Sequence, residues 1–109
     1  MGRISKRRID PEIEDRIFEI FWEYLASLKM PLQIKEFLVS LLSQTEQVML
    51  SKRLAIALLL SKGFNFEEID ETIKVSKSTV GMINRQMLAG VSGYQRAVEH
   101  ILPRKKVRR

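Results

Sequence analysis

The sequence predicts an all-α fold with about six helices. Glycine and proline are sparse, at five and three residues among 109, and apolar residues make up 45% of the chain. These apolar residues recur at three- and four-residue spacings rather than in alternation, which is typical of helices that bury one face. A chain of this length holds one domain with a small core. We expect that domain to span residues 10–102.

Residues 10–42 are predicted to form a pair of dimerisation helices. Asp10 and Pro11 are typical of a helix start, and Pro31 can open the second helix. Apolar side chains cover more than one face of the first helix, so it needs packing partners on two sides. In so short a chain, the second partner is expected to be another copy of the chain. The apolar set of the first helix is Ile13, Ile17, Phe18, Ile20, Phe21, Trp22, Tyr24, Leu25 and Leu28.

A core helix is predicted over residues 44–62. Ser43 and Glu46 have the spacing of a capping box, which satisfies backbone N–H groups at a helix start. The second half of the helix is apolar on most sides, and Gly63 is the expected residue just beyond its end. Arg53 lies within this helix among apolar neighbours. It can be a surface arginine whose stem packs on the core, or it can face a ligand or a phosphate.

Residues 66–88 have the layout of a helix-turn-helix, whose second helix enters the DNA major groove. Ser76 is a good N-cap for a helix that begins at Lys77, and Val75 is expected to fill the corner between the helices. A plain αα-hairpin with a solvated basic face is the alternative that this pattern leaves open. The expected inner faces are Phe66, Ile69 and Ile73, then Val80, Ile83 and Met87.

A last helix is expected over residues 93–102, after a linker at 89–93, and both chain ends are basic. Residues 1–9 and 103–109 hold nine of the 19 basic residues and no acidic one, whereas residues 10–102 hold 10 basic and 13 acidic residues. Basic arms that follow phosphates add salt-sensitive affinity for nucleic acid. Tails that aid solubility, or a nuclear-import signal, are the alternatives. The arm residues are Arg3, Lys6, Arg7 and Arg8, then Arg104, Lys105, Lys106, Arg108 and Arg109.

The face of the second motif helix opposite its apolar stripe is predicted to contact DNA. Lys77 and Ser78 lead this helix into the groove and are the expected base contacts. Gly81 would let the helix approach closely, at a helix cost of about 1 kcal/mol, and simple tolerance is the alternative. Arg85 and Lys74 are expected to contact phosphates. The whole predicted set is Lys74, Ser76, Lys77, Ser78, Thr79, Gly81, Met82 and Arg85.

The order of these features resembles the tryptophan-repressor-like superfamily over about half of the chain. The matching pieces are the helix start from Ser43 to Glu46, Leu50 and Arg53 in the core helix, Gly63, and Ser78-Thr79-Val80. Asn84-Arg85 further resembles the uncharacterised branch of that superfamily. Asp70 and Lys74 depart from generic helix-turn-helix patterns, which prefer a small residue and a turn glycine there.

The resemblance implies an intertwined all-α homodimer that presents two recognition helices to operator half-sites about 34 Å apart. In the repressor that names the superfamily, one arginine of the core helix and one of the recognition helix hold the corepressor. Arg53 matches the first arginine, but Met82 stands at the second, and a thioether cannot replace a bidentate guanidinium. The resemblance therefore implies a ligand pocket at Arg53, Thr79 and Met82, for a small molecule other than tryptophan or for none.

The sequence does not favour an enzyme. It has no cysteine, no glycine-rich phosphate loop and no metal-spaced cluster, and its one histidine, His100, is expected to face solvent. No apolar run reaches the roughly 18 residues of a membrane span. We predict a cytoplasmic, nucleoid-associated, dimeric DNA-binding regulator of transcription, and a repressor in particular, with no metal. The alternatives are a dimeric helical interaction module and a non-specific nucleic-acid-binding protein.

Overall fold

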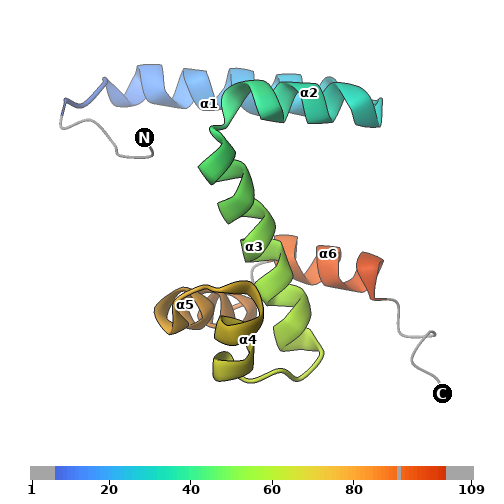
Figure 1. The fold of residues 1–109 in the computed structure, drawn as a ribbon. Coiled ribbons are helices and arrows are strands. Elements are labelled where there is room, and N and C mark those ends of the chain that lie inside the picture. Colours follow the sequence, from blue (N-terminus) through green and yellow to red (C-terminus); the bar gives the residue numbers. More distant parts are fainter. Residues whose placement is uncertain (1–6, 91, 103–109) are drawn as a thin grey trace. The chain divides into compact units, whose positions relative to one another are not determined.

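A computed structural model describes residues 7–90 and 92–102 (Figure 1). These residues form six helices and no strand. This confirms the predicted all-α class and helix number. The last helix begins at Ser92, inside the stretch predicted as a linker. Contacts divide the chain into two compact units, and the boundary between them in the sequence falls between Gln47 and Val48. The helices are α1 (Pro11–Ser27), α2 (Pro31–Leu41), α3 (Gln44–Ser61), α4 (Phe66–Ile73), α5 (Lys77–Leu88) and α6 (Ser92–Ile101).

In the first unit, α2 runs back alongside α1, and aromatic rings join the two helices (Figure 1). The Phe37 ring of α2 lies 4.8 Å from Tyr24 and 6.0 Å from Phe21, measured between ring centroids. Pro11 is the first residue of α1, as predicted. Asp10 occupies the N-cap position, but contrary to the prediction from its residue type, its side chain makes no capping hydrogen bond.

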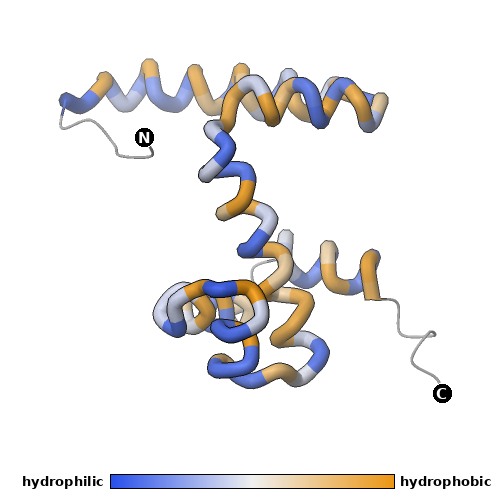
Figure 2. The backbone as a smooth tube through the Cα atoms, viewed as in Figure 1, coloured by the Kyte–Doolittle hydropathy of each residue, from blue (hydrophilic) through white to orange (hydrophobic). Residues whose placement is uncertain are grey.

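Neither α1 nor α2 contains a buried residue. Ile13, Ile17, Ile20 and Tyr24 recur every three or four residues on α1, and each is at least half exposed. On α2, Leu32 is 64% exposed. Figure 2 shows apolar positions recurring along both helices. Within a single chain, this unit therefore leaves much of its apolar surface in contact with water.

The second unit has a small buried core drawn from three helices. Ile56 and Ala57 of α3, Ile69 of α4, and Val80 and Ile83 of α5 have no exposed surface. Most of the inner-face residues predicted within 66–88 belong to this cluster or pack on it, while Phe66 instead stays 36% exposed. The partly buried residues around the cluster are Leu59, Leu60, Ile73, Val75, Met82, Met87, Tyr94 and Val98.

Local hydrogen bonds fix both ends of α3 where the sequence placed them. The Glu46 N–H donates to Ser43 Oγ at 3.1 Å, and the Ser43 N–H donates to Glu46 Oε1 at 2.8 Å, which confirms the capping box. At the other end, Gly63 has a φ of 95°. Its N–H donates to Leu60 O, and the Phe64 N–H donates to Leu59 O. This pair of bonds is a Schellman motif, in which glycine avoids the left-handed strain of other residues.

Candidate nucleic-acid interface

A non-glycine residue in the left-handed conformation forms the turn between α4 and α5. Lys74 has φ 57° and ψ 59°, and its N–H donates to Asp70 O at 2.8 Å. The left-handed region costs most residues about 1 kcal/mol or more, which glycine avoids. Lysine thus replaces the usual turn glycine, while the backbone keeps the glycine-like conformation.

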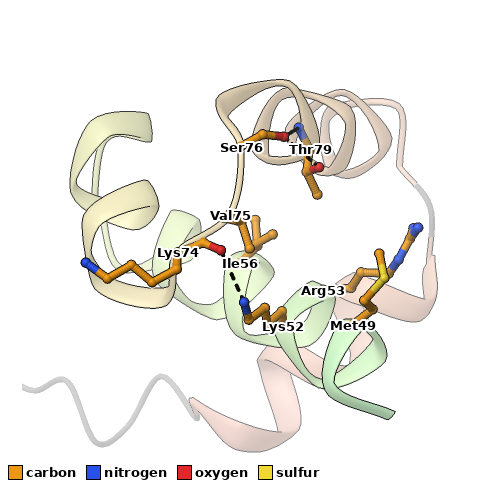
Figure 3. A pocket seen from close by; sticks show the side chains of 8 residues that line it. All are labelled: Met49, Lys52, Arg53, Ile56, Lys74, Val75, Ser76 and Thr79. Carbon is orange, nitrogen blue, oxygen red and sulfur yellow. Dashed lines mark hydrogen bonds between the residues drawn. The ribbon is translucent and has the colours of Figure 1, made fainter. Parts of the chain in front are cut away.

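The turn is tied to the core helix by a second lysine. Lys52 of α3 donates from Nζ to the carbonyl oxygen of Lys74 at 3.1 Å, across 22 residues of sequence (Figure 3). This carbonyl lies at the C-terminal end of α4, where the helix dipole favours a positive charge. Lys52 therefore helps to hold the turn against α3. No local sequence signal predicts this role, because the two residues are far apart in the chain.

Side-chain hydroxyl groups organise the N-terminus of α5. Ser76 is the N-cap, as predicted, and its Oγ accepts a hydrogen bond from the Thr79 N–H at 3.2 Å. The same oxygen lies 3.1 Å from Ser78 Oγ and 3.0 Å from Thr79 Oγ1. Lys77 and Ser78 are both exposed at this end. The structure thus brings the first predicted DNA contacts together at one helix end.

The face of α5 that is predicted to contact DNA is partly exposed in the structure. Lys77, Ser78 and Arg85 are exposed, and Gly81 is half-buried. Met82 is half-buried as well, and its side chain packs against the buried cluster. Its long, flexible thioether chain can reach the edge of the core from a position beside the outer face. The prediction that Met82 faces outward is therefore wrong.

Gly81 has room for a side chain, so the packing of α5 does not require glycine there. A Cβ atom on Gly81 would lie 3.6 Å from Arg85 Nη1 and 3.7 Å from Phe66 Cε2, both ordinary contact distances. The Arg85 guanidinium and the Phe66 ring thus flank the bare backbone. Glycine inside a helix costs about 1 kcal/mol relative to alanine, and nothing in the fold explains that cost.

A pocket of about 210 Å³ lies under the turn. Arg53 and Thr79 both line it, as predicted, but Met82 does not. Figure 3 shows the Lys74 side chain extending away from the pocket and the Arg53 side chain extending away from Lys52. The apolar part of the pocket lining includes the buried Ile56. The other lining residues are Met49, Lys52, Lys74, Val75 and Ser76.

The remaining predictions fall mostly at the chain ends. Arg7 and Arg8 are exposed, and the arm residues at positions 3, 6 and 104–109 lie outside the described residues. His100 is exposed on α6, as expected. Within the described ranges, no three metal-ligating side chains come together. No described helix is long and apolar enough to cross a membrane.

Two residues that were not predicted to have a role, Asn65 and Glu68, fix the start of α4. Asn65 Oδ1 accepts from the Glu68 N–H at 2.8 Å, and Glu68 Oε1 accepts from the Asn65 N–H at 2.9 Å. This is a second capping box. Its signal is visible in the sequence as an asparagine followed three residues later by glutamate. It sets the position of the first residue of α4, Phe66.

The tied turn, the capped second helix and the exposed polar face of α5 define a helix-turn-helix protein. The family model described as "Trp repressor protein" matches residues 17–102. Comparison with curated proteins and with solved structures gives no significant match. The match spans most of the chain, so the chain belongs to the Trp repressor family, which indicates a DNA-binding helix-turn-helix regulator.

Proposed function

We propose that this protein is a dimeric, sequence-specific repressor of transcription that inserts α5 into the DNA major groove. The observation that carries the proposal is the outer face of α5, where Lys77, Ser78 and Arg85 are exposed. On the same helix lies Gly81, a glycine that the packing of α5 does not require. A basic, hydrogen-bonding helix with a bare backbone position suits close approach to base edges. Such a protein would act on the nucleoid, in the cytoplasm.

We further propose that α1 and α2 form the dimer interface. Their apolar residues stay exposed in the single chain, and soluble monomers rarely leave apolar surface of this extent uncovered. Two-fold symmetry would present two copies of α5 to half-sites about one helical turn apart. The basic arms would add contacts to the flanking phosphates.

Selection of bound sequences from random duplex DNA tests the proposed function. We expect a two-fold-symmetric motif to be enriched at about 150 mM salt, where non-specific phosphate affinity is reduced. Without enrichment, and with binding that disappears as salt rises, the protein would be a non-specific binder. The absence of any DNA binding would favour a helical interaction module.

A pair of substitutions at Lys74 separates backbone strain from charge. Lys74→Gly should stabilise the fold by about 1 kcal/mol, because glycine relieves the left-handed strain, and Lys74→Ala should not. Thermal unfolding would detect this gain as a rise of about 4–8 °C in Tm. Both variants should weaken DNA binding equally and reduce the salt slope by about one unit.

The Lys74 side chain would have no phosphate contact if either variant kept the parent salt slope. Lys62→Ala is a suitable control, since Lys62 is an exposed lysine just beyond the C-terminal end of α3. It should leave both the slope and the affinity unchanged.

The pocket beside the turn supports a small-molecule corepressor as a second proposal. Arg53 offers a cationic group for an anionic ligand, and Thr79 joins the pocket to α5. Because Met82 cannot supply a guanidinium, we expect tryptophan to leave the selected motif and the affinity for it unchanged. If tryptophan increased the affinity, a conventional corepressor role would apply.

A further inference from the structure

We propose that Phe66, the first residue of α4, reads a thymine methyl group next to the base contacts of α5. This inference rests on the proposed function. It adds a residue of α4 to the residues of α5 that are proposed to recognise the DNA sequence. Phe66 was predicted to be buried with Ile69 and Ile73. Instead, Phe66 keeps 36% of its surface exposed while Ile69 keeps none.

The position of the ring carries the argument. Phe66 Cε2 lies 3.7 Å from the point where a Cβ of Gly81 would be, and Arg85 Nη1 lies 3.6 Å from the same point. The ring edge, the bare backbone and the guanidinium are therefore neighbours on one surface. Any DNA that reaches the backbone at Gly81 also reaches the Phe66 ring.

The chemistry of the ring selects its partner. A phenyl ring neither donates nor accepts a conventional hydrogen bond, and the thymine C5-methyl is the apolar group that the major groove displays. Contact between them would remove apolar surface from water on both sides. Arg85 on the other flank supplies the positive charge that draws DNA to this surface.

The rest of α4 is unsuited to lie along DNA. Glu67, Asp70 and Glu71 are carboxylates that phosphates repel, while Glu68 is engaged in the capping box with Asn65. That capping box fixes the backbone just before Phe66. The first residue of α4 is thus an uncharged contact, held in place at the end of the helix that adjoins Gly81.

The test removes the methyl group from the DNA and the ring from the protein. In the selected motif, each thymine is replaced in turn by uracil, which lacks only the methyl. At one position per half-site, we expect uracil to weaken binding by the parent protein about fourfold, the effect of one buried methyl group. Binding by Phe66→Ala should be insensitive to that replacement.

Phe64→Ala is the matched control, because Phe64 is 38% exposed and lies two residues away. It should keep the full uracil effect. The proposal would be overturned if the parent protein ignored uracil at every position. It would also be overturned if Phe66→Ala kept the parent's sensitivity, or if Phe64→Ala lost it. A parent protein that selects no motif would instead contradict the proposed function itself.

Discussion

Replacing Ile17 by glutamate is expected to convert the proposed dimer into monomers. Ile17 is 54% exposed and lies in the α1 stripe with Ile13, Ile20 and Tyr24. A dimer interface would bury it twice, once in each copy. A carboxylate buried there without a partner costs several kcal/mol per copy. We expect the dimer dissociation constant to rise at least 1,000-fold, since each 1.4 kcal/mol is a factor of ten.

Sedimentation or light scattering at micromolar concentration measures the change in mass. Leu88→Glu is the control, because Leu88 is 79% exposed, more than any other large apolar residue that the structure describes, and ends α5, outside the proposed interface. It should leave the mass unchanged. A parent protein that is already monomeric would contradict the dimer, and so would an Ile17→Glu variant that stays dimeric.

The same variant links assembly to DNA recognition. A monomer engages one half-site, so it loses the gain in effective concentration that a linked second site provides. Ile17→Glu should therefore bind a single half-site as the parent does and lose its preference for the full symmetric motif. Equal weakening on both DNAs would mean that the substitution damages the second unit.

Signals within a few consecutive residues were sufficient to predict three of the helix ends: the two ends of α3 and the start of α5. At the start of α3 and of α5, Ser43 and Ser76 each accept a hydrogen bond from a backbone N–H three residues further on. At the end of α3, the positive φ of Gly63 lets the backbone itself satisfy the last carbonyl groups of the helix. Such devices depend little on the rest of the fold, which is why sequence alone predicts them.

Contacts between distant segments could not be predicted in this way. The Lys52–Lys74 bond, the packing of Met82 and the exposure of Phe66 all depend on how α3, α4 and α5 cross. Helical spacing identifies an apolar face but does not fix which edge of that face a neighbouring helix covers. The candidate interface was therefore predicted in outline, with errors at its edges.

Gly81→Ala is expected to stabilise the protein and impair its DNA binding at the same time. The added methyl fits at ordinary contact distances from Arg85 and Phe66, and alanine removes a helix penalty of about 1 kcal/mol. Tm should rise by about 4–8 °C. In the proposed complex, the same methyl would stand between the helix backbone and the base edges, so affinity for the selected motif should fall at least tenfold.

Gly93→Ala is the control for the rise in stability and the loss of DNA affinity that are expected of Gly81→Ala. Gly93 lies in the first turn of α6, and a Cβ there would meet no atom within 4 Å. Alanine at Gly93 should raise Tm by less, because the position is near a helix end, and should leave DNA affinity unchanged. If Gly81→Ala gained stability without losing affinity, the glycine would be merely tolerated, and α5 would not approach DNA through this face. A loss of affinity confined to Gly81→Ala would show that this glycine carries its helix cost for the sake of DNA contact.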